Sequence, residues 1–464
     1  MGGSKLQLYA IGPQDFHLTA NPQITFYKKV YRRHTNFSIE NKQIFFTDTP
    51  TFGEEYIAKI QYEGDLLGNL YLEVDISGTV TSSNTGSYTV NHFAYSLLKN
   101  VEILIGGISI EKQYGIWMLI YDELTNNTSA NKNRENMSSS NGGRFTYDTL
   151  NFNCSSGKFN HLHGENYISM EQRTIGNCPL VFGGGINGNS TYTTNDGTFK
   201  KKMYIPLKLF FTKSPGLYLP LCALYSHEIQ LKFNFETATN LQGTSNITNL
   251  TLSSMKLYGE FILLDEEEKN KFKQSTHEYV IEQVQLNNDS FVNTGTTVNS
   301  DNANILDLPV QELNFSHPIK YFTWCVVNEG TPLDNSGMGP CYLSSLCFNN
   351  LYGNDGSGGL MSLRFNGEDR ENKIFMSYFT RYLISKYCKY NIDNDRIGIY
   401  SFALNPFENE PSGTCNFSRI KTSELNISIA NNDINNIKNK KMYIFGVNYN
   451  IFLINDGMAM IRYK

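Results

Sequence analysis

Three short segments carry residue types that suit chemistry, and the first suggests a dinucleotide site. The segment GGGINGN places Gly183, Gly185 and Gly188 in the spacing G-x-G-x-x-G. Such a site needs a helix to follow directly, because the helix N-terminus receives the pyrophosphate. Here the polar stretch NSTYTTNDGTF follows, which is typical of a loop. The glycines therefore predict a surface loop and no bound cofactor.

The other two segments are a histidine pair and a carboxylate pair. His161 and His163 would face the same side of a strand, but no third metal ligand lies near them in the sequence. Glu368 and Asp369 could form the carboxylate pair of glycoside hydrolysis, yet adjacent strand residues point to opposite faces. A turn with an ion pair to Arg370 is the better interpretation. With no G-x-S-x-G motif either, we expect no catalytic, cofactor-binding or metal-binding residues and no enzyme activity.

The composition indicates β-structure. The chain has 464 residues, of which 13% are aromatic and 18% are charged. Many aromatic residues and few charges suit strands that are joined by turn-rich loops. The length allows two or three domains with cores of their own. A net charge of −5 gives no sign of specific nucleic-acid binding.

The cysteines and the apolar runs bear on the compartment. The 8 cysteines are scattered and form no C-x-x-C pair, so we expect free thiols in a reducing compartment. The longest apolar run, GLYLPLCALY at 216–225, is about half the length of a membrane span. The N-terminus does not resemble a signal peptide. We therefore expect a soluble protein inside the cell that makes it.

A compact basic patch lies near the start of the chain, in QDFHLTANPQITFYKKVYRRHTNF (14–37). Asn21 suits an N-cap and Pro22 the first helical position, which predicts a helix over about 22–33. On that helix an apolar stripe and a basic side would lie opposite each other. The stripe is Ile24, Tyr27 and Tyr31, and the basic side is Lys28, Lys29, Arg32 and Arg33. Two interpretations stay open: a solvated face over a packed stripe, or a foot that meets an anionic surface or an acidic partner.

Alternation of apolar and polar residues predicts strands through the rest of the chain. The clearest cases are IQLKFNF (229–235) and ELNISI (424–429), followed by KNVEILIGG, KLYGEFILL, LMSLRF and GIYSFAL. Only LDEEEKNKFKQ (264–274) reads as a later helix, with acids at its front and lysines at its back. Tracts rich in Asn, Ser, Thr and Gly at 77–87, 125–143, 183–197 and 292–304 are predicted loops. This pattern predicts two β-sandwich domains with the helix as their joint.

Two segments indicate that the two sandwiches are alike. FFTKSPGLYLPLCALYSHEIQLKF (210–233) and FALNPFENEPSGTCNFSRIKTSELNISI (402–429) each run from a strand through a loop with prolines into an alternating strand. Their residue identity is negligible, so the likeness lies in the order of elements. It favours a duplicated sandwich.

Several long motifs together resemble a known family. YAIGPQDFHLTANPQITFYKKVYRRHTNF resembles the N-terminal signature of major capsid proteins from nucleocytoplasmic large DNA viruses, especially the mimivirus and algal-virus branch. Further blocks resemble that family in order, and the resemblance covers essentially the whole chain. They include KNVEILIGGISIEKQYGIWMLIYDELT, ILLDEEEKNKFKQSTHEYVIEQVQ, LNFSHPIKYFTW, YSFALNPFENEPSGTCNFSRI and GVNYNIFLINDGMAMIRY. The chain departs from the family in having Ala20 for a frequent Gly, and Met-Ala-Met where a Gly-Gly usually follows the Met.

The resemblance implies an all-β fold, a double jelly roll of two eight-stranded antiparallel sandwiches. It divides the chain into an N-terminal arm (1–24), a first jelly roll (25–264), a linker helix (265–274) and a second jelly roll (275–464). It implies a major structural protein of an icosahedral virion, assembled in the host cytoplasm from pseudo-hexameric homotrimers around an internal membrane. Neighbouring capsomers, minor capsid proteins, the penton protein and the viral membrane are the partners that it implies.

In this family the N-terminal segment lies on the inner side of the shell. The resemblance therefore implies that the stripe of Ile24, Tyr27 and Tyr31 docks on the jelly rolls. It assigns Lys28, Lys29, Arg32 and Arg33 to contacts with minor capsid proteins or anionic lipid headgroups. Two other functions remain as alternatives: a lectin-like jelly roll that binds carbohydrate, and a β-sandwich glycosidase. The glycosidase requires two facing carboxylates, which the sequence does not offer.

Overall fold

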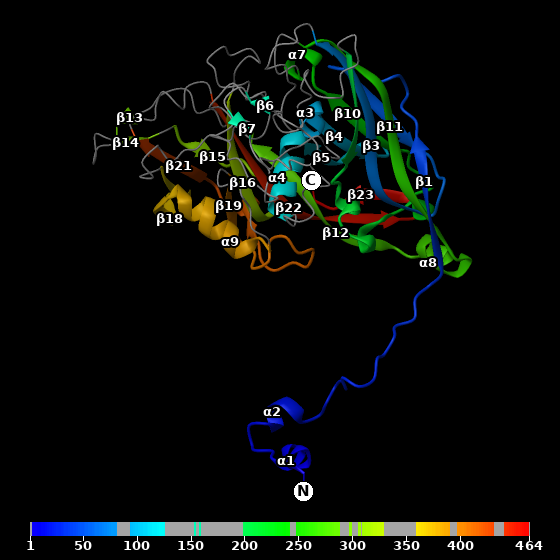
Figure 1. The fold of residues 1–464 in the computed structure, drawn as a ribbon, viewed down its shortest axis with the longest axis vertical. Coiled ribbons are helices and arrows are strands. Elements are labelled where there is room, and N and C mark those ends of the chain that lie inside the picture. Colours follow the sequence, from blue (N-terminus) through cyan, green and yellow to red (C-terminus); the bar gives the residue numbers. More distant parts are fainter. Residues whose placement is uncertain are drawn as a thin grey trace. The chain divides into compact units, whose positions relative to one another are not determined.

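Figure 1 shows the computed structural model of the chain. It describes residues 2–80, 93–125, 153–154, 157–158, 198–241, 247–287, 297–298, 305–307, 309–328, 359–389, 397–430 and 440–463. Contacts divide the chain into two units, Met1–Phe37 and Ser38–Lys464, and each is described by itself. The glycine-rich segment with Gly183, Gly185 and Gly188 lies outside the described residues, as do His161 and His163.

The first unit, Met1–Phe37, holds two short helices. Helix α1 spans Gly3–Tyr9 and α2 spans Phe16–Thr19, and neither contains a buried residue. The helix predicted over 22–33 is wrong, because these residues form a turn at 26–27 and otherwise irregular chain. Asn21 has a φ of 51°, which is left-handed and not the extended conformation of an N-cap. A helix of about ten residues is also unstable without a packed face.

The first half of the second unit forms two antiparallel sheets. Sheet A is ordered β1 (Phe37–Ile44), β11 (Ile247–Leu264), β3 (Leu66–Val80) and β8 (Thr198–Pro206), with β9 (Leu219–Pro220) also on β3. Sheet B is ordered β2 (Glu55–Ile60), β10 (Ile229–Phe235), β4 (Leu98–Ile105) and β5 (Ile108–Tyr114). Strand β10 is the predicted IQLKFNF, and every second residue of it is buried. A separate pair joins β6 (Asn153–Cys154) and β7 (Gly157–Lys158).

The second half forms two more sheets. Sheet C is ordered β12 (His277–Asn287), β22 (Lys440–Asn455), β16 (Pro318–Asn328) and β19 (Gly398–Ser401). Strand β20 (Cys415–Asn416) also pairs with β16, and β23 (Met458–Ile461) with β22. Sheet D is ordered β13 (Thr297–Val298), β14 (Ile305–Asp307), β21 (Ser423–Ala430), β17 (Leu360–Phe365) and β18 (Glu368–Phe375), with β15 (Gln311–Glu312) on β21.

The two halves have the same topology. When the main strands of each half are numbered one to eight along the chain, sheets A and C both have the order 1-8-3-6. Sheets B and D both have the order 2-7-4-5, with β14 as strand two of the second half. Eight strands in two sheets that exchange strands in this way form a jelly roll. The predicted double jelly roll is therefore confirmed.

The duplication extends to the connections between strands six and seven. The two segments with the same order of elements in the sequence, 210–233 and 402–429, both contain this connection. Each places a short strand on the beginning of strand three, β9 on β3 and β20 on β16. Each continues into a short 3-10 helix, η4 (Leu221–Ala223) or η6 (Phe417–Arg419). The predicted duplicated sandwich is confirmed.

The antiparallel pairing separates the two ends of each roll. Odd-numbered main strands run one way and even-numbered strands the other, so connections from odd to even strands all lie at one end. Tight turns close the opposite end, Gly106–Gly107 between β4 and β5 and Asn366–Gly367 between β17 and β18. All four polar tracts that were predicted as loops join an odd strand to an even one. Two of them are partly strand, because β3 continues to Val80 and β13 occupies 297–298. Strand β1 begins at the end with the tight turns, so the first unit is attached there.

Few helices accompany the sheets. Helix α8 (Glu266–Gln274) connects β11 to β12 as predicted, and its N-cap Asp265 accepts a hydrogen bond from the backbone N–H of Glu266. Strand five is followed by a helix in both rolls, α4 (Gly115–Thr125) after β5 and η5 (Tyr378–Tyr382) with α9 (Leu383–Tyr387) after β18. The remaining ones are α3 (Phe93–Leu97), α7 (Ala238–Leu241), η2 (Phe210–Thr212) and η3 (Pro215–Leu217). Within the described ranges, no helix is long and apolar enough to cross a membrane.

Candidate assembly surfaces

Helix α4 holds the two rolls together. It starts directly after β5 and lies between the two pairs of sheets in Figure 1. Its Met118 and Leu119 belong to the core of the first roll. Its Trp117, Ile120 and Leu124 belong to the core of the second. One helix of the first roll therefore buries side chains in both, which makes the pair of rolls a single body.

Aromatic rings dominate the contact on the side of the second roll. The ring of Trp117 lies 5.6 Å from Phe445 and 6.5 Å from Tyr321 between centroids, and Tyr114 lies 6.0 Å from Phe445. Phe322, the neighbour of Tyr321 on β16, contacts Phe315 in the interior of the second roll. Because adjacent strand residues point to opposite faces, Tyr321 and Phe445 stand on the outer face of sheet C.

An ion cluster crosses the same contact. Lys213 of the first roll places its Nζ 2.8 Å from Oε2 of Glu282 on β12. Lys320 on β16 places its Nζ 2.5 Å from Oε1 of the same carboxylate. The side chain of Lys320 is 0% exposed and that of Lys213 is 5% exposed. Lys320 also donates a hydrogen bond to the backbone oxygen of Glu408 at 2.6 Å. Glu282 is therefore the shared counter-charge of two buried ammonium groups that come from different rolls.

The pKa shifts in this cluster follow from burial and from the shared carboxylate. Burial alone would raise the pKa of Glu282, but Lys213 and Lys320 outweigh it and lower that pKa below its ordinary value. For Lys320, burial lowers the pKa by more than Glu282 raises it. For Lys213, burial is outweighed by Glu282 and other neighbours, so the pKa is raised. One carboxylate between two lysines stabilises the charge of one lysine better than that of the other.

Glu111 on β5 is a further buried carboxylate beside this contact. Its side chain accepts hydrogen bonds from the backbone N–H of Phe210 at 2.7 Å and from Nε2 of Gln113 at 2.6 Å. Burial raises the pKa of Glu111 to about 7, although Lys213 acts in the opposite direction. Next to it, Gln283 Nε2 donates across the contact to the backbone oxygen of Ile110 at 2.5 Å. The charge of Glu111 therefore changes near neutral pH, close to where the rolls meet.

The contact residues predicted near the N-terminus all lie in the first unit and are exposed. The exposed fractions are 72% for Ile24, 99% for Tyr27 and 77% for Tyr31. The Nζ of Lys29 lies 5.3 Å from the ring centroid of Tyr31. Because no helix forms here, an apolar face and a basic face are not separated. The structure does not bring the basic residues onto one helical side; they are Lys28, Lys29, Arg32 and Arg33.

The candidate chemical sites are structural where they are described. Asn366 and Gly367 form the predicted turn, with φ values of 51° and 84°. Asp369 accepts a hydrogen bond from Nε of Arg364 at 2.5 Å, so its partner is the residue across the hairpin and not Arg370. In the part of the chain that the structure describes, no three His, Cys, Asp or Glu side chains gather as metal ligands. Cys222, Cys325, Cys388 and Cys415 are free thiols, as predicted.

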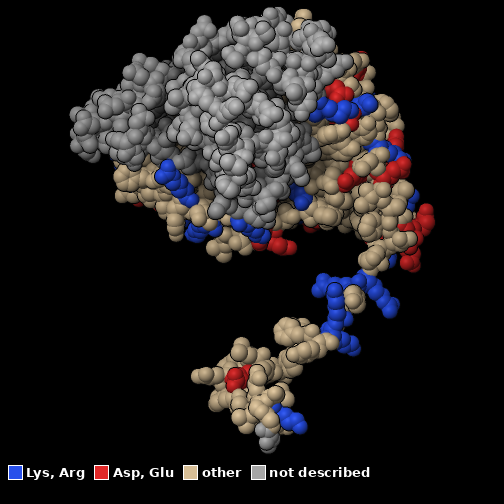
Figure 2. Space-filling model, in the orientation of Figure 1, with Lys and Arg blue, Asp and Glu red and all other residues tan. Residues whose placement is uncertain are grey.

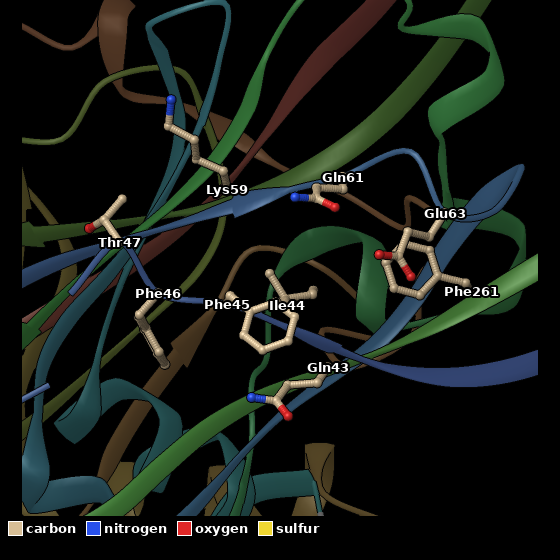
Figure 3. Close-up of a pocket in the computed structure, with 9 residues that line it drawn as sticks. All are labelled: Gln43, Ile44, Phe45, Phe46, Thr47, Lys59, Gln61, Glu63 and Phe261. Carbon is tan, nitrogen blue, oxygen red and sulfur yellow. The ribbon is translucent and has the colours of Figure 1, made fainter. Parts of the chain in front are cut away.

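A small cavity of about 160 Å³ opens where the end of β1 passes β2 and β11. Figure 3 shows its lining residues, which are Gln43, Ile44, Phe45, Phe46, Thr47, Lys59, Gln61, Glu63 and Phe261. Sites for small molecules usually measure roughly 300–1,000 Å³. The cavity is too small for such a ligand, so we assign it no binding function.

Two family models match the chain in succession. The model for the N-terminus of major capsid proteins matches residues 25–265. The model for major capsid proteins of large eukaryotic DNA viruses matches residues 268–460. The chain belongs to this capsid protein family. Its two matched regions meet at helix α8, between the pair of sheets A and B and the pair C and D.

Individual relatives agree with the family. The major capsid protein of Pyramimonas orientalis virus is 31% identical over the full length of both chains. That of Paramecium bursaria Chlorella virus 1 is 30% identical, again over both full lengths. Among solved structures, VP54 of PBCV-1 has a TM-score of 0.69 at 25% identity, over 95% of this chain and 100% of the other. The faustovirus major capsid protein, at 11% identity and a TM-score of 0.62, shares the fold.

Proposed function

We propose that this capsid protein assembles into pseudo-hexameric homotrimers that tile an icosahedral shell around an internal membrane. Residues 25–264 and 275–464 contain the two rolls of one subunit, which begin at strands β1 and β12, and residues 265–274 link them. The observation that carries the proposal is the repeated topology: each chain supplies two rolls of the same strand order, joined into one body by α4. Three such chains bring six similar rolls around a threefold axis, which gives a nearly hexagonal tile.

The chain acts in this proposal as a building block and has no enzymatic role. Its partners are copies of itself in the trimer, neighbouring capsomers, the penton protein and minor capsid proteins. It resides in the virion and is assembled in the host cytoplasm. Support comes from the family and from the buried side chains that tie the rolls together, since a rigid subunit suits a repeated lattice.

The N-terminal arm, residues 1–24, and the basic segment that follows it in the sequence make contacts on the inner side of the shell. The attachment of the first unit at the end of the roll with the tight turns supports this role, because the long polar tracts attach at the opposite end. Lys28, Lys29, Arg32 and Arg33 meet minor capsid proteins or anionic lipid headgroups there. Ile24, Tyr27 and Tyr31 supply apolar area to that contact. Exposed aromatic residues among basic ones suit a surface that is both apolar and anionic.

Reversal of the four basic charges tests this role. A variant with Lys28, Lys29, Arg32 and Arg33 all changed to Glu is expected to form the same oligomer as the wild type but fewer closed shells. Particle yield by electron microscopy and oligomer mass by light scattering measure the two effects separately. A variant with all four changed to Gln is the milder control. Normal shell yield from the Glu variant would show that the segment is not the inner contact.

A further inference from the structure

The two rolls of one chain meet where strand five of the first roll and its following helix lie against strands three and eight of the second roll. Strand five of the first roll (β5) and the helix after it (α4) press three aromatic residues against sheet C of the second roll. These are Tyr114, the last residue of β5, Trp117 three residues later and Tyr121 four residues after that. The rings that meet Tyr114 and Trp117 come from strands eight and three, Phe445 and Tyr321.

The second roll has a strand and a helix that correspond to β5 and α4, the two elements with which the first roll makes this contact. Its strand five, β18, ends at Phe375, and a helix begins at the next residue. Counting three and then four residues from Phe375 leads to Tyr378 and Tyr382. Their rings lie 5.3 Å apart, and those of Trp117 and Tyr121 lie 6.0 Å apart. Aromatic residues therefore occupy the same three positions in both rolls.

Within the described part of the chain, no sheet of another roll packs on Phe375, Tyr378 and Tyr382. Phe375 is 56% exposed and Tyr382 is 58% exposed, and Tyr378 is half-buried. Arg381 and Lys386 are exposed beside them. We call this set the helix surface: Phe375, Tyr378, Arg381, Tyr382 and Lys386. Aromatic residues and arginine are the types most enriched at the centres of protein interfaces.

The first roll has a sheet face that corresponds to the outer face of sheet C, with which the second roll makes this contact. Tyr258 on strand eight (β11) and Tyr71 on strand three (β3) stand opposite each other in the ladder, with rings stacked 5.3 Å apart. Their neighbours Leu72 and Leu257 are buried in the core, so the tyrosines point outward from sheet A. Tyr204 on strand six (β8) adds a third ring, 6.3 Å from Tyr71. These rings occupy the face and strands that correspond to Tyr321 and Phe445.

Both repeated surfaces carry charged residues beside their rings. On sheet A, Lys202 of β8 already pairs its Nζ with Oε1 of Glu73 at 3.1 Å. Glu73 and Glu260 flank the tyrosines of sheet A, and both contribute to raising the pKa of Tyr71, after burial and Tyr258. We call this set the sheet surface: Tyr71, Glu73, Tyr204, Tyr258 and Glu260. The helix surface contributes Arg381 and Lys386. In Figure 2, Lys and Arg lie on the side where Figure 1 places β18 and α9, and the side of β1 and β11 carries both Lys or Arg and Asp or Glu.

We propose that the helix surface of one copy packs on the sheet surface of the next copy, and so repeats between chains the contact that α4 makes within the chain. The inference rests on the proposed homotrimer, which sets the number of copies at three. Each chain carries one of each surface, so the contact is head-to-tail and closes into a ring. Contacts within and between chains then alternate around six rolls.

Two variants remove one surface each. Phe375→Asp with Tyr382→Asp replaces two rings of the helix surface with charged groups, and Tyr204→Asp with Tyr258→Asp does the same on the sheet surface. Wild-type protein is expected at roughly 158 kDa, three times the chain mass of 52.7 kDa, by light scattering at micromolar concentration. Each variant alone is expected at the mass of one chain. The matched control Leu404→Asp, at an 81% exposed apolar residue outside both surfaces, is expected to remain a trimer.

Mixing the two variants tests the head-to-tail geometry. The first variant keeps an intact sheet surface and the second an intact helix surface, so one native contact forms between them. The remaining pair of surfaces carries Asp on both sides and does not close. The mixture is therefore expected at about 105 kDa, twice 52.7 kDa, although neither variant associates alone. A contact that pairs like surfaces predicts no such rescue.

The outcomes separate this inference from the function on which it rests. Trimers from both Asp variants overturn the inference and leave the trimeric capsid protein in place. A wild type that stays monomeric overturns the trimer itself, and the inference with it. Circular dichroism checks that each variant is folded. If an Asp variant does not fold, Ala at the same positions removes the contact area without charge and is expected to raise the dissociation constant of the trimer at least tenfold; an unchanged constant contradicts the proposal.

Discussion

Trp117 of the first roll lies 5.6 Å from Phe445 of the second, measured between ring centroids, and is 1% exposed. Its helix also contributes Met118 and Leu119 to the core of the first roll. The rolls are therefore joined through shared core packing in addition to the linker helix α8. A subunit of this kind moves as one body.

Truncation of Trp117 tests that joint. Trp117→Ala removes a fully buried ring between two cores and is expected to cost about 3–5 kcal/mol of unfolding free energy. Urea unfolding followed by circular dichroism measures the loss. Leu404→Ala, at an exposed position, serves as the control and is expected to change stability by no more than about 0.5 kcal/mol. A loss of similar size in both variants would contradict the role of Trp117.

Removal of the shared carboxylate tests the ion cluster. Glu282→Gln leaves the buried ammonium groups of Lys213 and Lys320 without their counter-charge, and we expect a cost of about 3–5 kcal/mol. The triple variant Glu282→Leu, Lys213→Met and Lys320→Met removes all three charges and is expected to recover most of that loss. Denaturant unfolding of the two variants and the wild type gives the comparison. A triple variant that is less stable than Glu282→Gln would contradict the assignment.

The raised pKa of Glu111 predicts a pH dependence. Its pKa is about 7 in the folded chain against an ordinary value of 4.5, so between these values the unfolded chain loses the proton first. The contribution of this group to stability therefore falls as pH rises from about 4.5 to about 7, by about 3 kcal/mol in total. Glu111→Gln removes this dependence. The stability of the variant relative to the wild type should be greater at pH 8 than at pH 5, and an equal difference at both would contradict the prediction.

A single methyl group added at Gly398 in sheet C is expected to clash with its neighbours. A Cβ on Gly398 would lie 2.1 Å from Cε2 of the buried Trp324, whereas a Cβ on Gly216 would meet nothing within 4 Å. We expect Gly398→Ala to lower the thermal midpoint strongly, with a cost of at least about 1–3 kcal/mol from overpacking. Gly216→Ala should leave the midpoint nearly unchanged. Equal midpoints for the two variants in a thermal melt would contradict the packing around Trp324.

The strands were predictable because most have one face in a core and one in solvent. LMSLRF is β17, residue for residue, and IQLKFNF is β10. Helix α8 was predictable from its charges, since Glu266 and its neighbours lie at the front and Lys273 at the back. These signals are local, and each is set by one surface of the element.

Helix α4 was not predicted, and its sequence GIWMLIYDELT explains why. Met118 packs into one roll and Trp117 into the other, so apolar residues occupy most of its circumference. The periodicity that identifies a surface helix is lost when two faces are buried. The ion cluster was missed for a related reason. Lys213, Glu282 and Lys320 are far apart in the sequence, and only the packing of the rolls brings them together.

The helix predicted around Lys28 and Arg32 is the opposite case. Its amphipathic pattern is clear in sequence, but a short helix is stable only when its apolar face is packed. In the described first unit Tyr27 and Tyr31 are exposed, so no such packing compensates the cost of ordering the backbone. A pattern in the sequence specifies a helix only together with its partner surface.

A three-dimensional reconstruction of the purified oligomer by electron microscopy shows how many chains form the ring and which surfaces meet. We predict three copies around a threefold axis, with six rolls in a nearly hexagonal outline and α4 inside each chain's pair of rolls. We further predict that β18 and α9 of each copy face sheet A of the next. A ring with any other number of copies, or a particle that remains a single chain, would contradict this prediction.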